Sequence, residues 1–558
     1  MAYVIINDKH LKAIADVLRK YNDKLTYKPR EMAEAIDILG SDGGNHGGLT
    51  GKYIIGVDVP GAAFEVLVKD CIEEDGSYFM PDGMWEDKNI VGPIIIPYGL
   101  KEIPDEGLKD TLGITDITFA PELRTIGDYA FYNALDMADR VLVIGIDVEA
   151  IGDYSFANNE IGEIELNTTL TSIGNYAFAN NPNLTKCNGK LDSVPEGIFD
   201  ECTSLTHVEI GDKAESIGDY AFRNCGLTNI IFNENLRAIG KYAFMSCTDL
   251  LELNLSSNIE TIGEGAFSGC AFTEVELNKR LQSIGAYAFA GNENLLTVTF
   301  NEGLTDIEHH AFNNCTALKD IVFPSTLQRI SYNAFAVDYW NAGYIVNVTF
   351  NEGLTSIGDH AFANKNIVFD SLPSTLTNVG TRAFYRNNSL TSVEIPSGIT
   401  EIKRETFLNC YSLNTVTLNE GLLEISAQAF GGTKVYELIC PSSLKRFNPN
   451  AFYSDATTAR RLRRLEFDLS KNGLTFDNTS SYPLVMSTPN STLNNYITFK
   501  GQNGYKATTS SAYNRDFFSH ESVNNEYTTI SVPWDQSENP NGFPWGATNA
   551  TIIYNNGL

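Results

Sequence analysis

The stretch Ile217-Gly218-Asp219-Tyr220-Ala221-Phe222-Arg223-Asn224-Cys225 is a complete copy of the unit that decides the fold. The unit reads I-G-x-x-A-F-x-N-C in its fullest form and recurs about every 22 or 23 residues. Because a unit of this length cannot bury its apolar face alone, neighbouring units must stack on one another. The pattern predicts a β-rich solenoid whose function lies on a long surface and not in a pocket. The phenylalanines that mark its fifteen units are Phe131, Phe156, Phe178, Phe199, Phe222, Phe244, Phe267, Phe289, Phe312, Phe335, Phe362, Phe384, Phe407, Phe430 and Phe452.

One unit also shows how its chain is expected to run. In residues 390–402 the apolar Leu390, Val393 and Ile395 alternate with polar residues, which predicts a β-strand with one buried face. A Pro-Ser-Gly or Asn-Glu-Gly turn follows, and a second extended piece then brings Ile402 into the core. We expect the next step, x-x-Ala-Phe, to form a short helical turn that seats the phenylalanine.

Composition and charge exclude several classes of partner. Seventy acidic residues against 40 basic ones give a formal net charge of −30, which argues against binding to nucleic acid or to an anionic membrane surface. No stretch reaches the roughly 20 consecutive apolar residues that span a bilayer, so we expect no membrane insertion. The first residues lack the features of a signal peptide, and we expect synthesis and folding in the cytoplasm.

The cysteines follow the repeat. Six of the nine lie three residues after a repeat phenylalanine, where Asn159, Asn181, Asn292 and Asn387 stand in other copies. We interpret them as reduced structural residues that all point into the coil, because a linear row supplies neither disulfide geometry nor the four converging ligands of a zinc site. No P-loop, H-E-x-x-H or C-x-x-C motif is present, and we expect no metal, no cofactor and no catalytic residue. The six cysteines are Cys202, Cys225, Cys247, Cys270, Cys315 and Cys410.

These units closely resemble the BspA-like class of leucine-rich repeats, whose copies read L-x-x-I-G-x-x-A-F-x-x-C-x-x-L-x-x-V. We place the array at residues 99–469, about two thirds of the chain. Members of this class serve mainly as surface adhesion and recognition proteins. The resemblance therefore implies binding and not catalysis.

The two ends of the chain resemble a different group of proteins. The ending Pro544-Trp545-Gly546-Ala547-Thr548-Asn549-Ala550, with Val532-Pro533-Trp534 before it, is similar to the ending of bacteriophage tail and baseplate-associated proteins. The opening is also similar to theirs, although residues 27–30 replace a tighter spacing. The resemblance implies a virion tail protein whose partners include other tail or baseplate proteins.

The remaining segments are assigned from composition and spacing. Residues 1–39 are predicted to form a small helical hairpin for anchoring or oligomerisation, 40–48 a glycine-rich linker, 49–98 a small β module or N-terminal cap, and 470–558 a β-rich capping module. Such a hairpin buries little surface by itself, which suggests self-association, with a trimer favoured. Its apolar residues are Leu11, Ile14, Leu18, Met32 and Ile36.

The outward positions of the strands are the candidate ligand-binding face. They form two neighbouring columns, acidic in patches and separated by threonines, which at ~5 Å per coil would extend about 80 Å. Either this face is a solubilising surface that discourages lateral aggregation, or it binds a host protein or glycan. The second interpretation uses Glu209, Ile231, Glu276, Thr299, Val322, Glu394 and Thr417, with Ile439 as a further exposed apolar residue and Glu466 in the same column.

A second candidate site is the insertion between Phe335 and Phe362, which is predicted to bulge as an aromatic loop carrying Tyr339, Trp340 and Tyr344. Exposed aromatic rings stack on sugars and anchor interfaces, but packing of the loop against the coil explains these residues equally well. By contrast, Glu308-His309-His310 is interpreted as a solvated surface pair and not as a metal site.

Three functions are consistent with the sequence. The first is a non-enzymatic phage tail protein that binds a host cell-surface receptor, protein or glycan. The second is a bacterial BspA-like surface adhesin. The third is a tailspike-type polysaccharide-degrading enzyme, for which residues 470–558 offer carboxylates but no spacing that assures a catalytic pair. Those carboxylates are Asp477, Asp516, Glu521, Glu526, Asp535 and Glu538.

Overall fold

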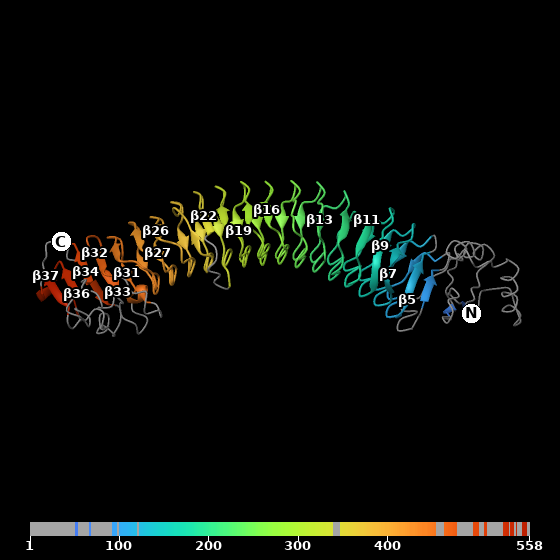
Figure 1. The fold of residues 1–558 in the computed structure, drawn as a ribbon, viewed down its shortest axis with the longest axis horizontal. Helices are drawn as coiled ribbons and strands as arrows, with labels where there is room; N and C mark the ends of the chain where they lie inside the picture. The colour runs from blue at the N-terminus through green and yellow to red at the C-terminus, as the bar shows by residue number, and fades with distance from the viewer. Residues whose placement is uncertain are drawn as a thin grey trace. The chain divides into compact units, whose positions relative to one another are not determined.

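The computed structural model describes residues 51–53, 66–68, 92–96, 100–119, 122–338, 346–453, 462–476, 495–501, 507–509, 528–534, 536–540, 543 and 550–554. The chain divides into two compact units, residues 1–258 and 259–558. In each unit the strands of successive coils lie side by side (Figure 1). The helical hairpin predicted at 1–39, including Leu11, Ile14, Leu18, Met32 and Ile36, and the linker at 40–48 lie outside the described residues.

The first unit consists of short strands that pair in parallel, apart from the antiparallel pair β1–β2. Within it β3 pairs with β5, and two further sheets have the orders β4-β6-β8-β10 and β7-β9-β11-β12. Its strands are β1 Gly51–Tyr53, β2 Val66–Val68, β3 Gly92–Ile95, β4 Glu102–Ile103, β5 Ile114–Thr118, β6 Thr125–Ile126, β7 Asp136–Val143, β8 Ala150–Ile151, β9 Glu160–Glu165, β10 Ser172–Ile173, β11 Lys186–Leu191, β12 His207–Ile210, β13 Ser216–Ile217 and β14 Ala238–Ile239.

The second unit repeats the arrangement. Long-strand sheets have the orders β16-β18-β20-β22-β24, β26-β28 and β30-β32-β34-β36-β37, and short strands pair as β15-β17-β19-β21-β23-β25 and β27-β29-β31-β33-β35. Its elements are β15 Thr261–Ile262, β16 Glu274–Glu276, β17 Ser283–Ile284, β18 Thr297–Thr299, β19 Asp306–Ile307, β20 Asp320–Val322, β21 Arg329–Ile330, β22 Val346–Thr349, β23 Ser356–Ile357, β24 Ile367–Val368, β25 Asn378–Val379, β26 Ser392–Ile395, β27 Glu401–Ile402, β28 Thr415–Leu418, β29 Glu424–Ile425, β30 Glu437–Cys440, β31 Arg446–Phe447, η1 Pro449–Phe452, β32 Arg464–Asp468, β33 Leu474–Phe476, β34 Asn495–Lys500, β35 Ala507–Thr509, β36 Thr528–Val532, η3 Gln536–Glu538 and β37 Thr551–Tyr554.

Most coils have three sides: a longer strand, a two-residue strand and a stretch of consecutive turns that carries the phenylalanine. The repeat phenylalanines stack face to face in each unit, with ring centroids 5.1 Å apart between Phe131 and Phe156 and 5.3 Å apart between Phe289 and Phe312. Their side chains are almost completely buried, and even Phe452 is only 7% exposed. The stack also crosses the insertion, because Phe335 and Phe362 remain 5.3 Å apart. The predicted solenoid is confirmed.

The predicted helical turn before the phenylalanine is wrong. The residue two positions before it and the residue two positions after it have a left-handed backbone, as at Tyr129 (φ 56°) and Asn133 (φ 52°). The N–H groups of Tyr129, Phe131 and Asn133 donate to carbonyls of the next coil at 2.8, 2.7 and 3.1 Å, and not along a helix. This alternation directs every second N–H towards the neighbouring coil, which satisfies the backbone without a helix.

The row three residues after each phenylalanine joins neighbouring coils. The thiol of Cys247 donates to the carbonyl of Phe222 in the preceding coil at 3.1 Å, and the Asn292 amide donates in the same way to Phe267 at 2.8 Å. All eight described cysteines are buried and unpaired by disulfides, and burial raises the pKa of Cys247 to about 12. Cysteine and asparagine both place a hydrogen-bond donor within reach of the preceding coil, which explains why either residue occupies this row.

Lys365 occupies this row in the Phe362 copy, although it is a charged residue. It is 4% exposed, and its ammonium donates to the carbonyl of Cys315. Burial lowers the pKa of Lys365 to about 8. A charged group in this position is costly, because it loses its hydration.

The Asn-Glu-Gly turns form side-chain clasps between coils in the second unit. The Glu352 carboxylate accepts from the backbone N–H of Ser374 at 3.0 Å and from its hydroxyl at 2.9 Å. Glu302 contacts Ser325, and Glu420 contacts Ser442, in the same way. The glycines at 303, 353 and 421 have φ values of 117°, 114° and 108°, a conformation that only glycine adopts readily.

Parallel stacking extends beyond the limits that the sequence analysis gave to the array. Strand β3 already pairs with β5 before residue 99, and β34, β36 and β37 extend the sheet of β30 and β32 beyond Leu469. In that region Trp534 is 4% exposed and packs against Phe499 at 5.8 Å. A separate capping module within 470–558 stays a prediction for the residues that the structure does not describe. No helix among the described residues is long and apolar enough to cross a membrane.

Candidate recognition face

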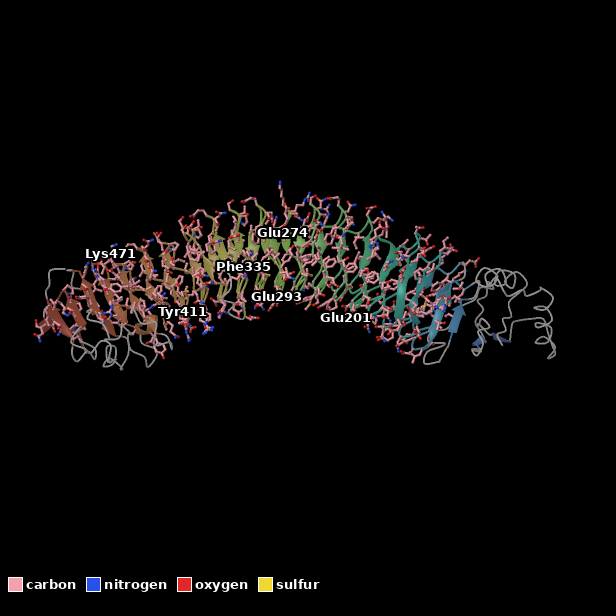
Figure 2. The ribbon with its side chains drawn as sticks, viewed as in Figure 1. Glu201, Glu274, Glu293, Phe335, Tyr411 and Lys471 are labelled. Carbon is pink, nitrogen blue, oxygen red and sulfur yellow. The ribbon has the colours of Figure 1, made fainter. Side chains whose placement is uncertain are left out.

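The outward columns of the second unit lie on β16, β18, β20 and β22. Glu276 is paired with Thr299, and Asp320 with Asn347, in successive parallel strands. Because strand side chains alternate, each of these residues is exposed while the valine or isoleucine between them is buried. Val322 is the large apolar residue here, at 60% exposed. Figure 2 labels Glu274 on this side of the unit, Phe335 inside the coils and Glu293 on the opposite side.

The same columns continue on later strands of the second unit. Glu394 is paired with Thr417, both exposed, and Ile439 is 52% exposed. Glu466 lies in the same column, since it is paired with Ile439, but it is only 5% exposed and is not free on the surface. The side chains of Lys500 and Arg464 cover its carboxylate, with N–O distances of 2.6 and 3.3 Å.

The first unit presents its outward columns on β5, β7, β9, β11 and β12. Glu209 is exposed, and Ile231 is the most exposed large apolar residue among those described, at 76%. Sequence reasoning missed Val143, which is paired with Glu165 and is 46% exposed. It fell outside the repeat pattern because β7 shifts register between Met137 and Val141.

Electrostatics differ between the face of the first unit and the β16–β22 part of the second. In the first unit cations lie beside the acids: Lys190 is 3.6 Å from Glu209, and Lys186 is 3.8 Å from Glu163. The side-chain hydrogen bond to Asp212 raises the pKa of Lys190. In the second unit Glu276 has no ion-pair or hydrogen-bond partner within the described parts of the chain. These basic residues were missed because they occupy no fixed position in the repeat.

Several predicted site residues cannot be placed. Tyr339, Trp340 and Tyr344 lie outside the described residues, as do all of the terminal carboxylates except the exposed Glu538. His310 is not simply solvated as expected: it stacks on Tyr287 with ring centroids 4.4 Å apart, and burial lowers its pKa. Within the described ranges no group of three or more His, Cys, Asp or Glu residues could hold a metal ion.

Comparisons with known proteins agree with this architecture. The profile of the family described as "BspA type Leucine rich repeat region (6 copies)" matches residues 81–189, 140–250, 215–339 and 338–458, more than half of the chain. No curated protein matches the chain.

Solved structures of similar proteins include a leucine-rich repeat protein from Bacteroides ovatus, 19% identical, with 75% of this chain and 93% of that chain covered and a TM-score of 0.47. A leucine rich cell surface protein from Faecalibacterium prausnitzii is 19% identical, with 74% and 95% covered and a TM-score of 0.28. The family match rests on the same stacked units as the phenylalanine rows: this chain belongs to the BspA-type leucine-rich repeat family.

Proposed function

We propose that this chain is a non-enzymatic host-recognition protein of a bacteriophage tail, which is carried in the virion and binds a host cell-surface protein or glycan through its outward strand face. The observation that carries the proposal is the exposed face of β16–β22, where Val322 stands among polar residues. Val322 is 60% exposed, and Thr299 and Thr349 on the neighbouring strands are exposed too. An apolar anchor inside a polar rim is the usual anatomy of a recognition surface.

The charge of this face restricts its partners. Glu274 and Glu276 lie on the first strand of the sheet, and no cation pairs with either within the described residues. Together with a net charge of −30, they favour a neutral or basic partner over an acidic one.

The tail assignment is supported by the two ends of the chain. The C-terminal Pro544-Trp545-Gly546-Ala547-Thr548-Asn549-Ala550 run and the N-terminal segment resemble phage tail and baseplate-associated proteins. The second candidate is a bacterial surface adhesin. Membership of the BspA-type family is as consistent with this candidate as with the tail protein. Both candidates use the same face, so one binding assay tests what they share.

The binding assay uses the fluorescently labelled full chain and a panel of intact bacterial strains. We expect saturable binding to some strains, a strong reduction by Val322→Ser, and no reduction by Tyr411→Ser. Tyr411 is a matched control because it is 39% exposed but lies away from the strand face, as Figure 2 shows. Absence of saturable binding across the panel contradicts the recognition function. An equal loss of binding in both variants would show that the strand face is not the binding surface.

The location of the protein separates the two candidates. Antibodies against the chain are applied to the producing bacterium before and after prophage induction, and labelled particles are examined by electron microscopy. Labelling of tails supports the phage assignment, whereas labelling of the cell surface alone supports the adhesin. Sustained release of oligosaccharide from host capsule by the purified chain would contradict both and indicate an enzyme. The molecular mass of the native protein tests the expected trimer.

A further inference from the structure

A groove of about 480 Å³ opens in the first unit, where the turns that follow the phenylalanines lead into β7 and β9. This volume lies within the roughly 300–1,000 Å³ range of small-molecule sites. The groove crosses four successive coils, because its lining residues come from the same positions of consecutive repeats. They are Leu112, Gly113, Asn133, Ala134, Leu135, Asp136, Asn158, Asn159, Glu160, Asn180 and Pro182.

The groove coincides with a local departure from the repeat. Ala134 stands three residues after Phe131, where the following coils have Asn159 and Asn181, and it is the smallest side chain of that row. Asn159 reaches into the space and binds the backbone, since its Oδ1 accepts from the N–H groups of Ala134 and Leu135 at 2.7 Å each. The floor is therefore fixed, and the hollow above it is built into the coils.

Three asparagine amides line the groove in a row, one in each coil. Asn133 donates to Asp110 at 2.6 Å, and Asn180 donates to Asn158 at 2.5 Å. These bonds orient the row but leave the Asn133 and Asn180 oxygens and the Asn158 amide N–H groups without a partner among the described residues. Left-handed φ values of 52° to 60° favour asparagine here, but they do not require an amide that faces an open hollow.

Two carboxylates lie on the groove beside this row. Asp136 and Glu160 begin β7 and β9 and are direct partners in the parallel register, so that like charges face each other. Asn183 donates to Glu160, while Asp136 has no hydrogen-bond or ion-pair partner in the described chain. No lysine or arginine lines the groove. Such a pair accepts hydrogen bonds from hydroxyl or amine groups and repels an acidic ligand.

The apolar contribution comes from the ends of the groove. Leu112, which is 54% exposed, lies on the first coil, and the exposed Pro182 lies on the fourth. A ligand that extends from one to the other must combine apolar faces with hydroxyl groups along its length. Sugar rings have this combination.

The spacing of the coils identifies the form of the ligand. Phe131 and Phe156 stack at 5.1 Å and Phe156 and Phe178 at 5.4 Å, which measures the step from one asparagine to the next. One pyranose ring of an extended β-1,4-linked glycan has about this length, whereas an extended peptide advances only ~3.3 Å per residue. We propose that the groove binds a linear, neutral or amine-bearing β-1,4-linked oligosaccharide, with one sugar ring at each asparagine. The groove shares no residue with the strand face of β16–β22, so this inference goes beyond the proposed recognition function.

Isothermal titration calorimetry of the full chain tests the proposal with three probes: the β-1,4-linked tetrasaccharides of glucose, N-acetylglucosamine and mannuronate. We expect one site for at least one of the two neutral probes and no binding of the acidic one. Asp136→Ala and Asn158→Gly should each raise Kd at least tenfold, the loss that follows from removing one strong hydrogen-bonding group. Glycine keeps the left-handed backbone at residue 158.

Matched controls come from the second unit. Glu293→Gln removes an exposed charge outside the strand face, and Asn314→Gly removes an amide at φ 58°, and both should leave Kd within twofold. Circular dichroism melting of each variant confirms folding. The proposal is overturned if neither neutral probe gives a heat of binding, or if the groove variants leave Kd unchanged. It is also overturned if the mannuronate probe binds equally well, or if tetralysine binds in place of a glycan. Cell binding that persists without glycan binding overturns this inference alone and leaves the recognition function standing.

Discussion

The interior and the outward face of the coils obey different rules, although they alternate along the same strands. Inside, each residue packs on its equivalent in the next coil, so that a phenylalanine in one coil favours a phenylalanine at the same position of the adjacent coils. Outside, no such constraint acts, and Glu276, Thr299 and Val322 follow one another in a single column. Strict repetition therefore marks stability in this protein, and variation marks the surface that is free to recognise a ligand.

The largest effect should come from breaking the phenylalanine row of the second unit. Phe312 is completely buried and stacks on Phe289 at 5.3 Å and on Phe335 at 5.1 Å. Phe312→Ala should lower the free energy of unfolding by about 3–5 kcal/mol, because it removes two stacking contacts and leaves a cavity. Urea denaturation followed by circular dichroism measures the change. A loss below about 1 kcal/mol would mean that the stack does not hold the coils together.

Lys365 is an exception inside the interior, and replacing it should stabilise the protein. The folded pKa of about 8 lies below the ordinary value of 10.5, so below pH 8 the fold must bury a charge, and stability rises as the pH increases from 8 to 10.5. At about 1.36 kcal/mol per pKa unit, Lys365→Met should gain up to about 3 kcal/mol at pH 7, reduced by the lost hydrogen bond to Cys315.

The gain in Lys365→Met should shrink between pH 8 and pH 10.5. The measurement is the difference in free energy of unfolding between variant and wild type at pH 7 and pH 10.5, which cancels the titration of other groups. A difference that is independent of pH would show that folding does not change the pKa of Lys365.

The clasps between turns should have a smaller effect, and its dependence on pH should lie in the acidic range. The backbone and side-chain hydrogen bonds of Ser374 lower the pKa of Glu352, and those of Ser442 lower the pKa of Glu420. Their stabilisation is present above the ordinary glutamate pKa and is lost as the pH falls through the lowered folded values. Glu352→Gln and Glu420→Gln should therefore be less stable than wild type at pH 7, and the deficit should be smaller at pH 3. Chemical denaturation at both values tests this, and a deficit that persists undiminished at pH 3 would assign the clasps another role.

Much of the interior could be predicted from sequence, because its spacing is fixed by packing. The row from Phe131 to Phe452 and the strand alternation around Val393 and Ile395 gave the solenoid. The left-handed turns were missed, although a signal was present: Gly197 and Gly265 stand where other copies have Tyr176 or Tyr220, a mixture that indicates positive φ.

The recognition face was predictable only in part. Alternation located Ile231 and Val322, but not the cations beside Glu163 and Glu209, which depend on residues of neighbouring coils. The burial of Glu466 escaped prediction in part for the same reason, since Lys500 comes from the neighbouring strand β34, whereas Arg464 lies on its own strand β32. The groove at Ala134 coincides with a departure from the repeat, and a pattern cannot indicate what lies at a departure.

The smallest expected change in stability is at the face itself, and it is the sharpest test of the difference between inside and outside. Val322 stands on the same strand as Ile321, whose side chain is 1% exposed and lies on the opposite side of the sheet. Val322→Ser should change the free energy of unfolding by no more than about 0.5 kcal/mol, because no packed neighbour is lost. Ile321→Ser should unfold the protein far more easily, because it buries a hydroxyl and opens a cavity. If binding to cells is lost in Val322→Ser while urea denaturation is unchanged, then the variable column serves recognition and the repeated column serves stability. If Val322→Ser instead destabilises the fold as much as Ile321→Ser does, the outward column is part of the packing and the distinction fails.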